Sequence, residues 1–521
     1  MEKNQVLRLA EPKPKGIWGI LFSRLFIVAI LIIFQLLLFL TAFNWLREHF
    51  ALFAAAQLLF TIIMILYLFN HRMDSTAKLT WMVLLAIFPF AGAIFLLYTQ
   101  IGLGYRAIHA RVKQLIGETK TALPQDETVL EKLEGDPYGT DDLHKYLARS
   151  GCFPIYDHTE TTYFTLGEEK FDAMLRELEK AEKFIFMEYF IIEEGYMWGS
   201  ILDVLSRKAK AGVDVRVMYD GMCEISLLPD DYPKRLEKLG IHAKAYAPIT
   251  PFLSTHYNYR DHRKILVIDG KVAFNGGVNL ADEYINRKER FGHWKDTALM
   301  LRGDAVQSFT LMFLQMWNID EPSPDFSLCH ARSDGSSGAD GFVMPYCDNP
   351  LDTDKVGETV YMDILNRATD YVHIMTPYLI LDGELEAALC YAAERGVDVK
   401  LILPGIPDKK AAYALAKTHY GVLTDAGVKI YEYIPGFVHA KVFASDDCRA
   451  VVGTINLDYR SLYHHFECAT YLYQASCISK IEEDFQNTLT KCRAVTPETI
   501  RNETTGYKLL GGLMKLIAPL M

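Results

Sequence analysis

The sequence lacks the features of disulfide-stapled secreted domains and of nucleic-acid-binding proteins. Its nine cysteines are spread over 521 residues without C-x-x-C spacing, which is unlike a disulfide-stapled secreted domain, and we expect mostly reduced thiols in a core. Positive charge is also scarce, because 54 Lys and Arg face 65 Asp and Glu, a formal net charge of −11. Nucleic-acid binding needs clustered positive charge to displace counterions from phosphates. We therefore expect no broad nucleic-acid-binding surface, although a local basic cleft stays open.

Charged side chains are absent from three long stretches near the N-terminus, at residues 25–43, 50–70 and 79–98. Each approaches the ~20 residues that a membrane-spanning helix requires. The first stretch is too long for the apolar part of a cleaved signal peptide, and no A-x-A-like site follows closely. We therefore predict that residues 1–105 form a membrane anchor with two or three transmembrane helices.

The charges around these stretches do not agree on one topology. Lysines and arginines precede the first stretch and follow the third, so both flanks are predicted to be cytoplasmic. Three complete spans cannot leave both flanks on one side. Either one stretch is re-entrant or interfacial, or the charge rule fails at one end, and the side that the catalytic region faces stays open.

The remainder of the chain alternates helix-like and strand-like segments and repeats itself, which predicts a duplicated α/β domain. The segment A-G-V-D-V-R-V-M at 211–218 matches R-G-V-D-V-K-L-I at 395–402, and the neighbouring elements follow in the same order. We predict domains at 143–319 and 342–521. Residues 106–142 would form a linker, and so would 320–341, which is rich in Pro, Ser, Gly and Asp.

The strongest feature is a motif of the form H-x-K-x-x-x-x-D that occurs once in each half. Its members are His262, Lys264 and Asp269, and then His439, Lys441 and Asp446. Each copy is followed at the same distance by an asparagine, Asn279 and Asn456, in a Gly-containing turn. On a strand, residues two apart project from the same face, so each His–Lys pair shares one face. Asp269-Gly270 predicts a hairpin turn, which makes a scaffold role for this Asp at least as well supported as a catalytic one.

The repeated motif resembles the phospholipase D superfamily in both halves. The segments 376–378, 456–462 and 466–467, together with the end of the anchor at 81–89, are similar to bacterial cardiolipin synthases from about residue 75 to the C-terminus. That family usually has two spanning helices, one fewer than the apolar stretches here. The resemblance implies two pseudo-symmetric phospholipase D-like domains, each a mixed sheet flanked by helices. They would follow an N-terminal transmembrane helical anchor in a multi-pass protein of the bacterial cytoplasmic membrane.

The resemblance also implies one active site where the two motifs meet. Displacing an alkoxide from a phosphodiester needs a nucleophile, an acid and positive charge, and the motifs supply all three without a metal or another cofactor. By resemblance His262 attacks phosphorus to give a phosphatidyl-histidine, while His439 protonates the departing glycerol. Supporting roles then fall to Lys264, Lys441, Asn279, Asn456 and Thr454 as phosphate ligands, and to Glu467 and Asp296 as carboxylates that orient the histidines.

Several activities share such a site. The leading hypothesis is the conversion of two phosphatidylglycerol molecules to cardiolipin and glycerol, with phosphatidylglycerol and membrane lipid as partners. A phospholipase D or a transferase for another headgroup is the alternative, because the motifs define the donor phosphate and not the acceptor. A nuclease is disfavoured by the anchor and the acidic charge, and a silent membrane scaffold by the two complete motifs. Acyl-chain preference and oligomeric state stay open.

Two further features are ambiguous. No Cys, His or carboxylate at a metal-ligand spacing accompanies His464-His465, so we expect no metal site there. The apolar tail 507–521 contains two lysines, and it is predicted to be either an interfacial segment or a helix docked on the domain.

Overall fold

The computed structural model describes residues 6–10, 30, 33, 34, 36, 37, 40 and 50–520, apart from 72, 101–102, 152, 249–258 and 331–338. The apolar stretch 25–43 therefore lies mostly outside the described residues, and so does the middle of the expected linker 320–341. The eight described cysteines are all free thiols.

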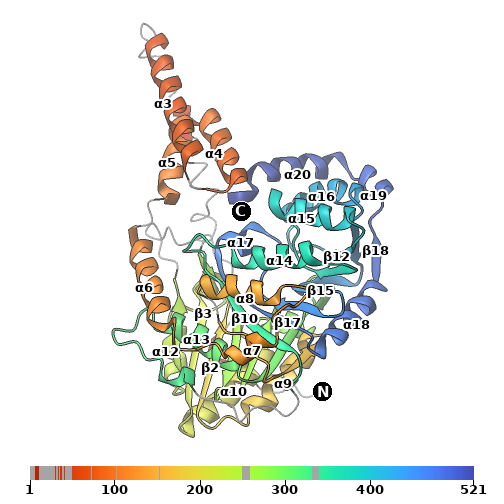
Figure 1. The fold of residues 1–521 in the computed structure, drawn as a ribbon. Coiled ribbons are helices and arrows are strands. Elements are labelled where there is room, and N and C mark those ends of the chain that lie inside the picture. Colours follow the sequence, from red (N-terminus) through yellow and green to blue (C-terminus); the bar gives the residue numbers. More distant parts are fainter. Residues whose placement is uncertain are drawn as a thin grey trace.

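Two mixed β-sheets with equivalent strand orders form the body, which confirms the predicted α/β fold with an internal repeat (Figure 1). The first sheet has the order β1-β9-β7-β6-β2-β3-β4, with β1 (Thr159–Phe164), β2 (Phe184–Tyr189), β3 (Asp214–Asp220), β4 (His242–Tyr246), β6 (Lys264–Ile268), β7 (Val272–Gly276) and β9 (Ala298–Gly303). The second has the order β10-β17-β16-β15-β11-β12-β13-β18, with β10 (Phe342–Asp348), β11 (Tyr371–Met375), β12 (Asp398–Pro404), β13 (Lys429–Tyr433), β15 (Val442–Ser445), β16 (Arg449–Gly453), β17 (His465–Tyr473) and β18 (Cys492–Ala494). In both sheets the central strand pairs in parallel with one neighbour and antiparallel with the motif-bearing strand.

Amphipathic helices pack on the sheets through an apolar stripe. In α9, for example, Phe171, Met174 and Leu178 recur at helical spacing and are buried. The first half contains α9 (Gly167–Leu178), α10 (Tyr196–Lys210), α11 (Cys223–Ser226), α12 (Tyr232–Glu237), η2 (Asp282–Ile285), α13 (Val306–Trp317) and η3 (Ser327–His330). The second contains α14 (Val356–Arg367), α15 (Gly383–Glu394), α16 (Lys410–Asp425), α17 (Tyr459–Tyr463), α18 (Cys477–Leu489), α19 (Pro497–Arg501), α20 (Thr505–Ile517) and η4 (Ala518–Leu520).

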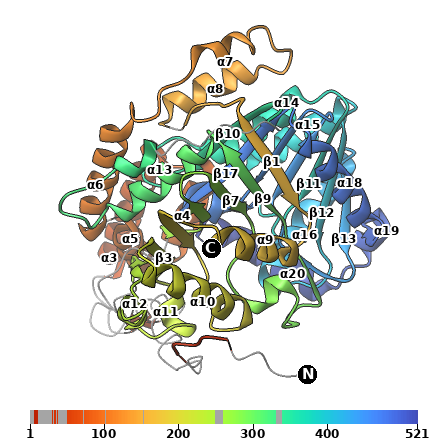
Figure 2. The same ribbon diagram turned by 90° about the horizontal axis from the view of Figure 1, so that it is seen from below.

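The two halves share one core. A single buried cluster contains Phe186 and Phe313 from the first half together with Val442 and Val452 from the second. Seen from below, the strands of the two halves lie side by side (Figure 2). Because this shared core is apolar and closed, the halves are held in one fixed relation.

Two short strand pairs join the halves beside the motifs. β5 (Arg260–Asp261) pairs in parallel with the start of β17, and β8 (His293–Lys295) pairs in parallel with β14 (Gly436–Val438). The His262 N–H donates to the Phe466 carbonyl at 2.9 Å, and the His439 N–H donates to the Lys295 carbonyl at 2.7 Å. Each motif histidine is therefore fixed by backbone from the opposite half.

The segment expected as a linker at 106–142 is largely helical and packed. It contains most of α6 (Leu103–Thr119), all of α7 (Glu127–Glu131) and the start of α8 (Thr140–Arg149). On α8, Leu143 and Leu147 are buried in the core of the second half, although this helix precedes the first half in the chain. The predicted domain limits did not anticipate that α8 packs on the second half.

In the part of the chain from residue 50 onward, this segment is preceded by α3 (Phe50–Asn70), α4 (Ser75–Ile87) and α5 (Pro89–Gln100). None of the helices in the described part of the chain is both long and apolar enough to cross a bilayer. The stretch 79–98, predicted as one spanning helix, is interrupted at Phe88, whose φ of −128° and ψ of 72° are not helical. Pro89 explains the break, because its ring disfavours the helical conformation of the preceding residue. The predicted multi-pass anchor is thus not found among the described residues.

Candidate active site

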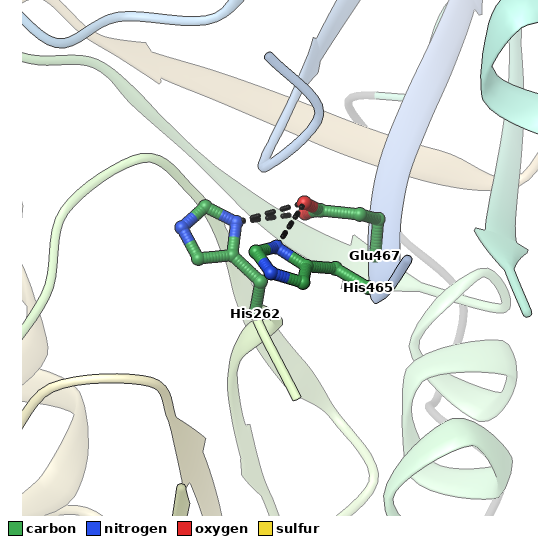
Figure 3. Close-up of side chains that lie close together, drawn as sticks. All are labelled: His262, His465 and Glu467. Atoms are coloured by element: carbon green, nitrogen blue, oxygen red, sulfur yellow. Dashed lines mark hydrogen bonds and ion pairs between the residues drawn. The ribbon is translucent and has the colours of Figure 1, made fainter. Parts of the chain in front are cut away.

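The two motif histidines lie where the halves meet, and each is bound by a carboxylate of the opposite half. His262 Nδ1 is 2.9 Å and 3.0 Å from the two oxygens of Glu467 on β17. Figure 3 shows the ring facing this carboxylate. His439 Nδ1 is 2.7 Å from Asp296 Oδ2, directly after β8. A carboxylate accepts from an N–H, so in both rings Nδ1 carries the proton and Nε2 keeps its lone pair in the neutral form.

The motif lysines lie beside these rings and are almost fully buried. Lys264 Nζ donates to the His262 carbonyl at 2.5 Å. Lys441 Nζ donates to the His439 carbonyl and lies 2.9 Å from His439 Nδ1. The Nδ1–H of His439 donates to Asp296, so Nδ1 has no lone pair for Lys441. The Lys441 Nζ therefore lies beside the ring without a hydrogen bond to it. The site therefore holds two lysine side chains that, when protonated, can neutralise a phosphate.

Burial governs the protonation of these groups. It lowers the pKa of His262 well below 6.5, and the Lys264 and Lys441 ammoniums lower it further. Burial and Lys441 lower the pKa of His439 to about 4, against the opposing effect of Asp296. Burial also lowers the pKa of Lys264 to about 8 and that of Lys441 to about 7. At neutral pH both imidazoles are therefore neutral, as a nucleophile or a general base requires.

The polar residues predicted as phosphate ligands have other partners. Asn279 accepts from the Ile191 N–H at 3.0 Å and donates to the Tyr284 hydroxyl at 2.8 Å. Asn456 Nδ2 makes a long 3.4 Å bond to Asp458. The Thr454 hydroxyl donates to Glu467 Oε2 and therefore holds the carboxylate that faces His262. Asn279 and Thr454 thus shape the site in this structure, while the amide of Asn456 is the least constrained of the three.

The motif aspartates are not brought to the histidines. Asp269 lies at the far end of β6, roughly 20 Å along an extended strand from His262. Its carboxylate accepts from the backbone N–H groups of residues 182, 183 and 184. Asp446 likewise accepts from the N–H groups of residues 369–371. Asp269 has a positive φ of 54°, as the predicted hairpin turn requires. Both aspartates tie a hairpin to the start of the central strand, and these contacts favour a scaffold role.

The second glycine of the pair before Asn279 makes room for a side chain of the site. A Cβ added at Gly277 would lie 2.1 Å from Asp296 Oδ1. Gly277 therefore has to lack a side chain for Asp296 to reach His439.

Sequence reasoning missed Lys170, which lies on α9 behind the site and is completely buried. Its ammonium donates to the Val278 carbonyl at 3.2 Å, next to Asn279. Burial lowers its pKa to about 7, although Asp296 raises it. The available signal was a lysine adjoining Phe171 on the apolar face of an amphipathic helix.

The expectation of no metal site at His464-His465 stays a prediction, although the fold brings a possible group of ligands together there. The fold brings His262 next to His465 and Glu467, and one ligand atom from each of the three lies within 4.8 Å of the others. His262 lies in the other half of the chain from His465 and Glu467, so no local residue spacing indicated this group.

Comparison with known proteins agrees with this geometry. The family model described as "Cardiolipin synthase, PLD-like domain" matches residues 174–317 and 361–489. A Streptococcus mutans protein described as uncharacterized is 58% identical over 88% of this chain and 99% of its own length. A cardiolipin synthase of Alkalihalophilus pseudofirmus is 32% identical, covering 88% of this chain and 91% of its own. The crystal structure of Haemophilus influenzae phosphatidylserine synthase shares the fold, with a TM-score of 0.52 at 13% identity over 70% of this chain and 95% of that one.

The family match covers both motif-bearing halves, and the identity to a cardiolipin synthase extends over most of the chain. With two histidines, two lysines and two orienting carboxylates assembled at the junction of the halves, the chain is an enzyme of the phosphatidyltransferase type and belongs to the cardiolipin synthase family of the phospholipase D superfamily.

Proposed function

We propose that this enzyme converts two phosphatidylglycerol molecules to cardiolipin and glycerol through a phosphatidyl-histidine at His262. The observation that carries the proposal is the crossed pairing of Glu467 with His262 and of Asp296 with His439. It supplies two imidazoles whose Nδ1 atoms are both committed to carboxylates. Their Nε2 atoms are then available for one nucleophilic and one acid–base role, which is what a double displacement at phosphorus needs.

In the first step His262 Nε2 attacks the phosphorus of the donor, and an N–P bond forms as the bond to the glycerol oxygen breaks. His439 gives its Nε2 proton to that oxygen, and glycerol leaves. His439 is neutral without substrate, since its pKa is about 4. A phosphodiester anion beside the two lysines brings negative charge to the site, which raises the pKa of His439 and lets it carry the proton.

In the second step the terminal hydroxyl of another phosphatidylglycerol gives its proton to His439. Its oxygen attacks phosphorus, the N–P bond breaks, and His262 leaves as a neutral imidazole. Lys264 and Lys441 neutralise the non-bridging oxygens in both steps, and this stabilisation is strong because both lysines are buried.

The substrate is a lipid, and an exposed apolar surface supports contact with a membrane. Leu509, Leu513 and Leu516 on α20 are exposed and share one face of the helix. The opposite face packs on α16, where a Cβ at Gly511 would lie 2.4 Å from the Ala414 carbonyl. The tail is therefore docked on the domain and also offers an apolar stripe. α20 lies on the same side of the body as α3 and α4 (Figure 1).

Purified protein in non-ionic detergent micelles with phosphatidylglycerol tests the reaction. We expect cardiolipin and free glycerol in equal amounts, measured by mass spectrometry and a glycerol assay, and neither product from His262→Asn. Phosphatidic acid in place of cardiolipin would show that water is the acceptor and would refute the proposed transfer in favour of a phospholipase D.

Co-sedimentation with phosphatidylglycerol vesicles tests the membrane contact. Leu509→Ser combined with Leu513→Ser should reduce the bound fraction, because it removes apolar area from the exposed stripe. Ile225→Ser on α11, another exposed apolar residue, is the matched control. Equal binding of all variants would exclude α20 as a contact.

A further inference from the structure

His465 is a buried histidine that the proposed reaction does not use. It begins β17, is 8% exposed, and its Nδ1 has no hydrogen-bond partner among the described residues. This nitrogen points toward Glu467 but lies 3.6 Å from Oε1, beyond hydrogen-bond distance. A buried, unpaired ring nitrogen is costly unless something binds it.

Figure 3 shows what surrounds this nitrogen: the Glu467 carboxylate faces both His465 and His262. The three ligand atoms lie within 4.8 Å of one another. Two imidazoles and one carboxylate are a common protein ligand set for Zn²⁺, with bonds of about 2.0–2.2 Å and a fourth position for water. Separations of 2.9 Å and 3.6 Å from Glu467 Oε1 to the two rings need only small side-chain shifts to meet such an ion.

The surroundings hold the ligands in place. The Thr454 hydroxyl binds Glu467 Oε2, which leaves Oε1 directed at the two rings. The His262 ring packs edge-on against Phe190, with centroids 4.8 Å apart, and the His465 ring lies 5.4 Å from that of His262. Fixed outer contacts of this kind orient metal ligands and raise their affinity.

We propose that His262, His465 and Glu467 form a binding site for Zn²⁺ or a similar transition-metal ion, and that occupation of this site inhibits the enzyme. The inhibition rests on the proposed function, because the ion would take the Nδ1 of the nucleophile and its carboxylate partner at once. Binding through Nδ1 would move the ring proton to Nε2, which then has no lone pair for attack on phosphorus. The Lys264 and Lys441 ammoniums repel a cation, so binding is reversible and weaker than at a structural zinc site.

The ligands also set the selectivity. Nitrogen donors favour Zn²⁺, Co²⁺ and Cu²⁺, whereas Mg²⁺ and Ca²⁺ prefer oxygen. We therefore expect Zn²⁺ to inhibit at concentrations at which Mg²⁺ has no effect, and a chelator to restore turnover.

The test uses the full chain without an affinity tag, in non-ionic detergent. Titration calorimetry with ZnCl₂ and visible absorption with CoCl₂ are recorded without lipid, because phosphatidylglycerol itself binds cations. Inhibition by ZnCl₂ is then measured with phosphatidylglycerol. His465→Asn removes one ligand, and His464→Asn is the matched control at the neighbouring position. Thermal unfolding shows whether each variant is folded, and His465→Gln replaces His465→Asn if that variant is not.

We expect wild type and His464→Asn to bind one Zn²⁺ and to give the absorption of imidazole-bound Co²⁺. In His465→Asn binding should weaken by at least about 10-fold, and the half-inhibitory Zn²⁺ concentration should rise equally. Absence of binding to wild type, or equal binding to His465→Asn, overturns the site. Binding without inhibition overturns the regulatory part. A wild type that binds Zn²⁺ through His465 but makes no cardiolipin refutes the proposed function and leaves the metal site standing.

Discussion

Glu467 holds the Nδ1 of His262 from 205 positions further along the chain and from the other half of the fold. Asp296 does the same for His439 in the opposite direction, across 143 positions. Each motif histidine therefore has its carboxylate partner in the opposite half of the fold. The two similar halves thus form one site in which one histidine faces a glutamate and the other an aspartate.

This crossing predicts that the two carboxylates affect adduct formation and adduct transfer to different extents. Glu467→Gln should lower formation of the phosphatidyl-enzyme, because a neutral amide is a weaker acceptor and its NH2 group can turn to the ring and favour the wrong tautomer, at a cost on the order of 10²–10⁴ in rate. Asp296→Asn should leave more adduct but slow its transfer to the acceptor. Rapid acid quench with labelled phosphatidylglycerol separates the steps. Equal loss of adduct in both variants would contradict this division.

The histidines themselves should differ in the same way. His262→Asn should abolish the covalent adduct, because an amide cannot attack phosphorus. His439→Asn should mainly impair protonation of glycerol and activation of the acceptor, costing on the order of 10²–10⁴ in rate. Acid-quenched protein analysed by peptide mass spectrometry locates the label. Label on His439 in wild type would reverse the roles and keep the two-step reaction.

Turnover should survive chelation. Two buried lysines already supply the positive charge that a metal would otherwise bring to the phosphate. EDTA added to the micellar assay should therefore leave the rate unchanged, or raise it where trace Zn²⁺ is present. A loss of activity that only a divalent ion restores would contradict this expectation.

Asp269 should matter for stability more than for chemistry. Asp269→Asn keeps a residue that tolerates the positive φ but weakens the bonds to three backbone N–H groups. We expect a loss of about 1–3 kcal/mol in unfolding free energy, with kcat per folded molecule within a few-fold of wild type. Denaturant unfolding and active-site titration measure the two effects. A kcat loss as large as that of His439→Asn, without destabilisation, would restore a catalytic role.

Acid should destabilise the fold partly through His439. Its pKa is about 4 in the folded chain, against 6.5 for a histidine in water, so between these limits the unfolded chain binds a proton that the folded chain does not. Stability from this group is therefore complete above pH 6.5 and is lost as the pH falls toward 4. His439→Asn should show a shallower fall of the unfolding temperature over this window. Parallel curves for wild type and variant would show that His439 is already protonated in the fold.

The sequence alone was sufficient for the duplicated α/β fold, the two motifs and the family. These features depend on local periodicity and spacing: strands and amphipathic helices are encoded over a few residues, and His262 and Lys264 share a face because they lie two apart. The break at Phe88 was also local, since Pro89 signals it, but the length of the apolar stretch hid it.

Only the tertiary structure decided which groups meet. The sequence pointed to Glu467 and Asp296 as carboxylate partners, but not to the histidine that each would bind in the opposite half. Asn279 and Thr454 were predicted to bind phosphate, yet the fold gives their polar atoms other partners. His465 acquires His262 as a neighbour only when the halves pack. Such contacts depend on the docking of two surfaces around a shared apolar core, and no spacing along one chain segment encodes that docking.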